Sequence, residues 1–128
     1  KGVRTVTAME IFKTAAAYLS QSVEDSEDLA PFVLPWLNVL LAESLPTENG
    51  MREAEGEIAL AKAPVLLTLN DTIPYHDEIA CIALAYGLAS DFCRDDDNDY
   101  RVSDFRARYV NALNEATRGT QNLVRDVY

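Results

Sequence analysis

The chain is poor in the side chains from which most active sites are built. Its 128 residues include one histidine, His76, and two cysteines, Cys81 and Cys93. Neither cysteine lies in a CxxC pair or beside a second histidine, so a zinc site or a Cys–His nucleophile lacks the usual parts. The chain also has no phosphate-binding glycine loop, no HExxH and no GxSxG motif. We therefore expect no enzymatic activity, no metal site and no cofactor.

Positive charge and long apolar runs are also scarce. Eleven basic residues against 21 acidic residues give a net charge of −10. This balance disfavours a tight nucleic-acid binder, because neutralising phosphates requires a positive surface. No run approaches the ~18 consecutive apolar residues of a membrane span, and no signal-peptide pattern opens the chain. We expect a soluble chain that makes no membrane contact.

The two cysteines are twelve residues apart on one predicted helix. At ~1.5 Å per residue they are separated by about 18 Å along the axis. A disulfide requires Cα atoms within ~7 Å, so Cys81 and Cys93 cannot pair with each other. We expect two small hydrophobic side chains in a reducing compartment.

The acidic run that follows Arg94 has part of a calcium-binding pattern. Asp95, Asp97 and Asp99 occupy positions one, three and five of an EF-hand loop. The glycine required at position six is Tyr100, and the chelating glutamate required at position twelve is Arg106. We expect the run to cap the next helix instead, with Asp97 or Asn98 as the N-cap.

The remaining candidates for catalytic side chains have structural interpretations instead. Glu53, Glu55 and Glu57 diverge around a helix, which predicts a solvated acidic face. Residues 75–78 read as the polar first turn of a buried helix.

The spacing of apolar residues predicts helices along most of the chain. A first helix fits residues 8–22, where Thr7 and Glu10 have capping-box spacing. A second, strongly apolar helix fits residues 28–43. Residues 45–50 read as a turn, and a short acidic helix interrupted by a glycine follows. An extended segment then leads to Pro74, with at most a short strand.

The most informative stretch runs from Asp71 to Ala116 and predicts two helices joined by an acidic hinge. The first of the two is apolar on nearly every side, so protein must surround it. The second is amphipathic and lies against the first along one stripe. The final helix is expected to end near Arg118 and Gly119, where glycine suits a C-terminal cap.

These elements predict an all-α fold, a helical bundle of four to five helices with a long central loop and an extended C-terminal tail. We assign residues 1–118 to a helical domain and residues 119–128 to an interaction tail. Asn38 is expected to bond a neighbouring backbone, and Gly87 to mark the close approach of another backbone. The expected structural core residues are Trp36, Asn38, Tyr86, Gly87, Phe105 and Tyr109.

The only basic cluster consists of Arg94, Arg101, Arg106 and Arg108. Two interpretations are open. These arginines pair with the neighbouring Asp95–Asp99, Asp104 and Glu115 of the same chain, at ~0.2–0.5 kcal/mol per pair, or they contact the acidic face of another copy.

Three segments carry a family resemblance: the helix PWLNVLLAE, the segment LNDTIPYHDEIACIALAYGLASDF with its Ala-Tyr-Gly-Leu-Ala centre, and the hydrophilic turn leading into YRVSDFRARYVNAL. They resemble the head–tail connector proteins (neck adaptor or head-completion proteins) of long-tailed bacteriophages. The resemblance covers most of residues 8–117, and its motifs are structural rather than chemical.

The resemblance implies a structural protein of the virion neck, assembled in the bacterial host cytoplasm. It implies a homo-oligomeric ring, typically a dodecamer, that joins the portal protein to a tail-side neck or stopper protein. DNA would pass through the lumen without specific binding. The C-terminal segment matches the place where such adaptors extend to grip the portal or a neighbouring subunit. The residues so implicated are Asn122, Leu123, Val124, Arg125, Val127 and Tyr128.

A second function stays open. The chain could be a small cytosolic helical adaptor or regulator that binds a basic protein partner through its acidic face. Monomeric behaviour at high concentration and salt-sensitive capture of a basic protein would favour it.

Overall fold

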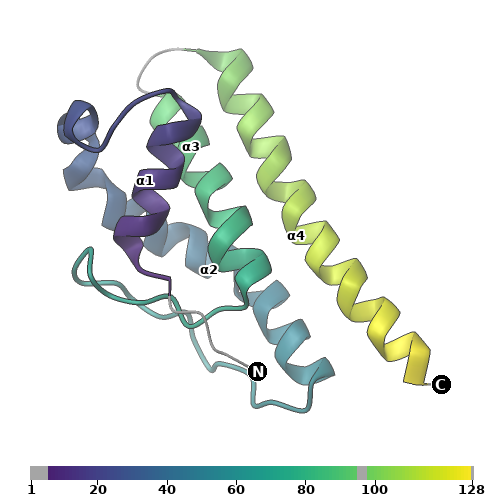
Figure 1. Ribbon diagram of the computed structural model, residues 1–128. Helices are drawn as coiled ribbons and strands as arrows, with labels where there is room; N and C mark the ends of the chain where they lie inside the picture. Colours follow the sequence, from purple (N-terminus) through teal and green to yellow (C-terminus); the bar gives the residue numbers. More distant parts are fainter. Residues whose placement is uncertain (1–5, 95–97, 128) are drawn as a thin grey trace.

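Helices account for most of the computed structural model, which describes residues 6–94 and 98–127, with the backbone alone for residues 120–127. The α-helices are α1 (Ala8–Tyr18), α2 (Ala30–Ala54), α3 (Leu84–Arg94) and α4 (Asp99–Val127). A 3-10 helix, η1 (Glu24–Leu29), leads into α2, and a π-helix, η2 (Glu78–Ala83), leads into α3. The four α-helices pack as a bundle with α4 along one side (Figure 1), which confirms the expected all-α fold.

The start of α1 follows from local sequence. The Thr7 side chain accepts a hydrogen bond from the Glu10 backbone N–H at 3.2 Å, and the Glu10 carboxylate accepts from the Thr7 N–H at 3.3 Å. This is the predicted capping box, which satisfies two backbone donors of the first turn. The helix ends at Tyr18, earlier than the expected residue 22, because Ser20 adopts a positive φ of 58°.

Helix α2 is longer than the sequence pattern predicts. It continues through residues 45–50, so the expected turn there is wrong. Pro46 lacks a backbone donor, and the residue four positions earlier, Ala42, is exposed, so its carbonyl can be hydrated. Beside and beyond Pro46 the helix buries Leu45 partly and Met51 fully. Tertiary packing therefore stabilises a continuous helix at Pro46, where a proline would normally end the helix.

The combined stretch Glu24–Ala54 is long and apolar enough to cross a membrane by length and composition. This is weak evidence, because core helices of bundles share that composition, and α2 buries Val33, Leu37, Leu40 and Leu41 among its neighbours. The expectation of no membrane contact stays a prediction.

Two asparagines of α2 hold the long central loop. The Asn38 amide accepts from the Leu66 N–H at 2.7 Å and donates to the Leu66 carbonyl at 3.2 Å. Asn49, three helical turns further on, makes the same pair of bonds to Leu60, at 2.7 and 3.0 Å. The prediction that Asn38 bonds a neighbouring backbone is confirmed. The only strand-like pairing in the described part of the chain is an isolated bridge between Thr7 and Thr72.

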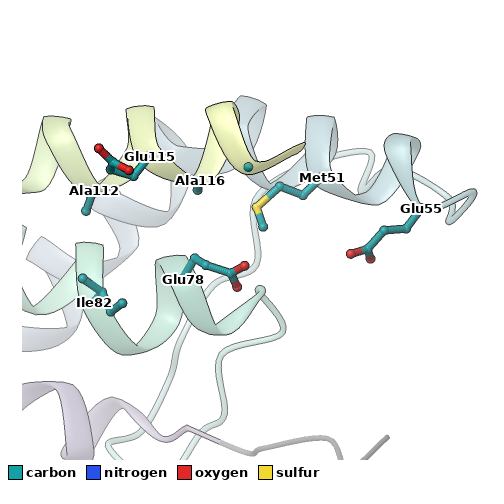
Figure 2. Close-up of a pocket in the computed structure, with 8 residues that line it drawn as sticks. Met51, Glu55, Glu78, Ile82, Ala112, Glu115 and Ala116 are labelled. Atoms are coloured by element: carbon teal, nitrogen blue, oxygen red, sulfur yellow. The ribbon is translucent and has the colours of Figure 1, made fainter. Parts of the chain in front are cut away.

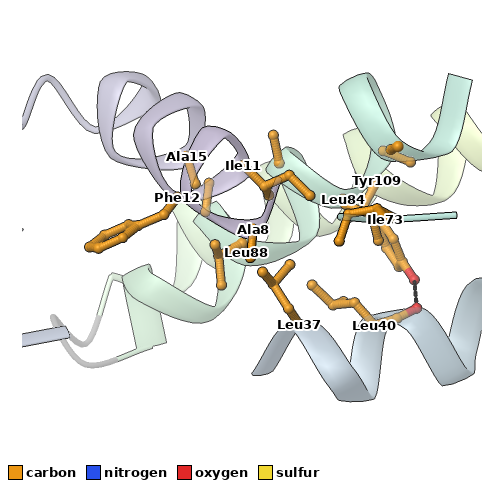
Figure 3. Close-up of a cluster of buried hydrophobic side chains, with 14 of the residues drawn as sticks. Ala8, Ile11, Phe12, Ala15, Leu37, Leu40, Ile73, Leu84, Leu88 and Tyr109 are labelled. Atoms are coloured by element: carbon orange, nitrogen blue, oxygen red, sulfur yellow. Dashed lines mark hydrogen bonds between the residues drawn. The ribbon is translucent and has the colours of Figure 1, made fainter. Parts of the chain in front are cut away.

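The core lies where α3 passes between the other helices (Figure 3). Tyr109 of α4 is 1% exposed, and its hydroxyl is 3.5 Å from the Leu40 carbonyl of α2. Gly87 is tightly packed, but against the side chains of Leu40 and Tyr109, so the expected close approach of another backbone is wrong. Phe105 and Tyr109 are buried, whereas Trp36 and Tyr86 are half-buried at the rim of the core. Cys93 is buried and Cys81 half-buried.

Helix α4 begins as predicted but does not end as predicted. Asn98 is its cap, with its side-chain oxygen accepting from the Arg101 N–H at 3.1 Å; Asp97, the alternative cap, lies outside the described residues. The helix passes through Gly119 and continues to Val127, so the expected end near Arg118 is wrong. Residues 119–127 are helical in place of an extended tail.

Candidate functional site

A buried carboxylate, Glu48, lies at the centre of a polar cluster that joins α2 to the end of the central loop. The Glu48 side chain is 1% exposed. It accepts from Arg52 Nε at 2.6 Å, from the His76 backbone N–H at 2.7 Å, and from His76 Nδ1 at 3.0–3.1 Å. A buried carboxylate is costly unless paired and hydrogen-bonded, and here every contact comes from a donor.

His76 is held between two carboxylates. Its second ring nitrogen, Nε2, lies 2.7 Å from Glu55 Oε1. Burial alone would lower the pKa of His76, but the hydrogen bonds to Glu55 and Glu48 outweigh burial, and the pKa is raised above its ordinary value. The imidazole is therefore fixed in position and orientation from both sides.

The residues before His76 are also fixed to α2. Arg52 Nη2 donates to the Pro74 carbonyl at 2.7 Å. The hydroxyl of Tyr75 donates to the Leu41 carbonyl at 2.6 Å, and burial together with the charge of Glu48 raises the pKa of Tyr75 to about 12. Tyr75 is thus a buried, neutral donor rather than part of a polar first turn. The expectation that residues 75–78 form the first turn is wrong for 75 and 76, because the helical residues begin at Asp77, directly before η2.

A groove opens beside this cluster, between the C-terminal part of α2, η2 and α4 (Figure 2). Its volume is about 410 Å³. Met51 points into it between Glu78 and Ala116, and Ile82 faces Ala112 across it. The eight lining residues are Met51, Glu55, Glu78, Ile82, Ala112, Glu115, Ala116 and Gly119. The floor is apolar and the rim carries three carboxylates.

A second exposed surface is apolar and carries no charge. Residues 29–42 contain no charged side chain, yet Phe32 is 49% exposed and Val39 is 57% exposed. The loop held by Asn38 adds Val65 and Leu67, which are 69% and 78% exposed. We call these four residues, with the exposed Pro35 between the first two, the α2 apolar face. Exposed apolar side chains gathered on one helix and on the loop bound to it are typical of protein interfaces.

The basic cluster has partners within the chain. Arg94 lies 3.6 Å from Asp91, Arg106 lies 3.1 Å from Glu43, and Arg108 lies 3.2 Å from Asp104. Arg101 donates to the Tyr18 carbonyl at 3.4 Å and lies over the Phe105 ring. The intramolecular contacts include one expected partner, Asp104, whereas Asp91 and Glu43 were not expected. A contact of the same arginines with another copy stays a prediction.

The C-terminal residues expected to contact the portal have side chains outside the described part of the structure. Asn122, Leu123, Val124, Arg125 and Val127 lie on the last turns of α4, where the structure describes backbone only. Tyr128 lies outside the described residues. Their role in binding stays a prediction.

Sequence reasoning did not group the residues of the Glu48 cluster. Glu48 and Arg52 have the i, i+4 spacing of a helical ion pair, which could have been noticed had residues 45–50 been read as helix. Their connection to His76 spans 28 residues and depends on the path of the central loop. Comparisons with models of known protein families, with curated protein sequences and with solved structures found no match to this chain.

Proposed function

We propose that this chain is a structural subunit of the neck of a long-tailed bacteriophage, which assembles into a ring that joins the portal to the tail and conducts DNA. The α2 apolar face is the observation that carries the proposal. A strip of exposed apolar side chains without charge is unfavourable in water and is stabilised when a second protein surface covers it. The sequence resemblance indicates which assembly to expect: a ring of identical subunits between the portal protein and a tail-side neck or stopper protein.

The charge distribution supports passage of DNA rather than its capture. The chain carries a net charge of −10, and Arg106 and Arg108 are each within 3.2 Å of a carboxylate of their own chain. Arginines that are already paired with carboxylates neutralise fewer phosphates. Fewer counterions then leave the DNA, so these arginines add little affinity for it. A lumen built from such subunits would let DNA slide past.

The first test compares the solution mass of the chain with that of two charge variants. Light scattering after size exclusion, with negative-stain imaging of any large species, should show a ring for the unmodified chain at high concentration. Val39→Glu places a carboxylate in the α2 apolar face and should abolish that species. Ile58→Glu is the matched control, because Ile58 is 89% exposed and lies outside the face. A Val39→Glu protein that assembles like the unmodified chain would contradict the proposed interface.

Ring proteins can stay monomeric until a docking partner provides a template. If the isolated chain is monomeric, the same three proteins are mixed with the purified portal of the phage that encodes them, and bound subunits are counted. Capture of the unmodified chain and of Ile58→Glu, but not of Val39→Glu, supports the proposal. Equal failure of all three proteins to bind the portal argues against it.

The groove favours a second candidate, a small cytosolic helical adaptor that binds a basic partner. Its apolar floor at Met51 and Ile82 and its rim of Glu55, Glu78 and Glu115 fit an amphipathic helix with basic flanks. This candidate predicts a monomer whose partner is released by salt and by Glu78→Lys. A ring that forms normally in the Glu78→Lys variant would separate the two functions.

A further inference from the structure

Three side chains from two distant segments converge at the C-terminal end of α2. One ligand atom each from Glu55, Glu57 and His76 lies within 4.8 Å of the other two. The two carboxylates follow the end of α2, and the imidazole comes from the far end of the central loop. Imidazole nitrogen and carboxylate oxygen are common ligands of divalent transition cations.

Backbone geometry fixes where the two carboxylates lie. Gly56 has a φ of +79°, which suits the left-handed residue that ends a helix. The Gly56 N–H donates to the Glu53 carbonyl at 3.1 Å, and the Glu57 N–H donates to the Arg52 carbonyl at 2.7 Å. This is the pair of bonds of a Schellman motif, and it turns the chain so that Glu55 and Glu57 both reach His76.

A buried group outside this set of ligands orients the imidazole. Glu48 is fully buried and held by Arg52, and a carboxylate only accepts hydrogen bonds. His76 Nδ1 therefore carries a proton directed at Glu48, which leaves Nε2 directed at Glu55 and its neighbour. Histidines that bind metals usually donate the other ring N–H to a carboxylate in the same way, which fixes the ring and raises its basicity as a ligand.

The charge of the cluster also calls for a cation. Both ring nitrogens of His76 donate to carboxylates, so the ring is cationic, and the carboxylates of Glu48, Glu55 and Glu57 face two cations, Arg52 and His76, among the described residues. One negative charge is then in excess, and exchange of the Nε2 proton for a divalent cation would balance it. Tetrahedral ligands at ~2.0–2.1 Å from zinc lie roughly 3.3 Å apart. Because the present spacing is within 4.8 Å, side-chain movements of about 1 Å would close the site.

We propose that Glu55, Glu57 and His76 bind one Zn²⁺ ion, with Glu48 orienting the imidazole and water completing the coordination shell. The cation takes the place of the proton on Nε2, which leaves to solvent. A nitrogen ligand selects zinc over Mg²⁺ and Ca²⁺, which prefer oxygen ligands. The bound ion would tie the end of α2 to the start of η2 and so fix both ends of the central loop. This role is structural and independent of ring assembly.

The test uses the full chain without a histidine tag, stripped with a chelator and titrated with ZnCl₂ by calorimetry. The expected result is one Zn²⁺ per chain and a higher Tm. Among the described residues the Glu57 side chain makes no hydrogen bond or ion pair, so Glu57→Gln should leave the metal-free Tm unchanged. It should weaken zinc binding at least ~10-fold. Glu53→Gln is the matched control, since Glu53 is also exposed and lies outside the site.

His76 gives an independent readout, because it is the only histidine of the chain. The imidazole nitrogen spectrum of the labelled protein should therefore report on this site alone, and zinc should shift the Nε2 signal strongly at one equivalent. Equal zinc affinity in Glu57→Gln and Glu53→Gln, or binding that leaves the Nε2 signal unchanged, would overturn the proposal. Either result would identify the binding as adsorption to surface carboxylates.

Discussion

Gly87 of α3 lies against Leu40 of α2 so closely that a Cβ on the glycine would be 2.9 Å from Leu40 Cδ2. The same Cβ would be 3.1 Å from Tyr109 Cδ1 on α4. Side chains of two helices thus occupy the space that any other residue at position 87 would need. This contact sets how near α3 can lie to both α2 and α4.

A leucine at position 87 should disrupt the bundle. Its added carbons would overlap Leu40 and Tyr109, both about 1% exposed, and overpacking of a filled core typically costs ~1–3 kcal/mol and occasionally more. We expect Gly87→Leu to lose ~1–3 kcal/mol or more of unfolding free energy, measured by urea denaturation. Gly50→Ala is the matched control, because nothing lies within 4 Å of a Cβ there and α2 should gain ~0.5–1 kcal/mol. Native stability in Gly87→Leu would show that the core can reorganise around the site.

The two asparagine contacts of α2 can be tested against each other. Asn38→Leu removes two hydrogen bonds and leaves the N–H and carbonyl of Leu66, which is 4% exposed, without those partners. We expect a loss of ~1–3 kcal/mol and faster hydrogen exchange of the Leu66 amide. The Leu60 amide, held by Asn49, should keep its protection. Equal acceleration at both amides would mean that the loop detaches as one unit.

The sequence predicts this fold best where the signal is local. The Thr7–Glu10 cap needs only three residues of separation, and it is present as expected. The length of α2 could not be predicted in the same way, because Pro46 and Gly50 are local turn signals. The burial of Glu48 and Met51 outweighs these signals, and part of what satisfies Glu48 is the backbone N–H of His76, 28 residues further along the chain.

The proposed zinc site illustrates the same limit. Glu55 and Glu57 read as a solvated acidic face, because a continued helix would point them in different directions. The positive φ of Gly56 ends the helix between them and brings both toward one side. The sequence indicates that Gly56 interrupts the helix. It does not indicate that the central loop returns to this point and places His76 beside the two carboxylates. Long-range loop paths are set by contacts such as Asn38 with Leu66, which no spacing rule encodes.

Asp71 should make stability depend on acid pH. Its carboxylate accepts from the backbone N–H of Leu67 at 2.7 Å, from that of Thr68 at 3.0 Å and from the Thr68 hydroxyl at 3.0 Å, and these bonds lower the pKa of Asp71. A carboxyl with a lowered folded-state pKa stabilises the fold above its unfolded pKa, ~3.9, and that contribution is lost as pH falls through the folded pKa.

The urea midpoint of the unmodified chain should therefore exceed that of Asp71→Asn at pH 6, and the difference should shrink toward pH 3. Thr68→Ala removes one of the three donors and should show a smaller difference at pH 6. An equal difference between the unmodified chain and Asp71→Asn at both pH values would indicate that the hydrogen bonds survive protonation.

Removal of residues 119–128 should separate folding from assembly. Ala116 is 5% exposed and is the last buried side chain that the structure describes on α4, while Thr117 and Arg118 are exposed. The truncated chain should keep its Tm within about 2 °C, since ~1 kcal/mol shifts Tm by several degrees in a domain of this size. Under the proposed neck function, the removed turns, about 13 Å of helix, reach beyond the core toward the portal, so portal capture should be lost. Unchanged capture by the truncated chain would exclude the segment from the interface, and a large fall in Tm would assign it to the bundle instead.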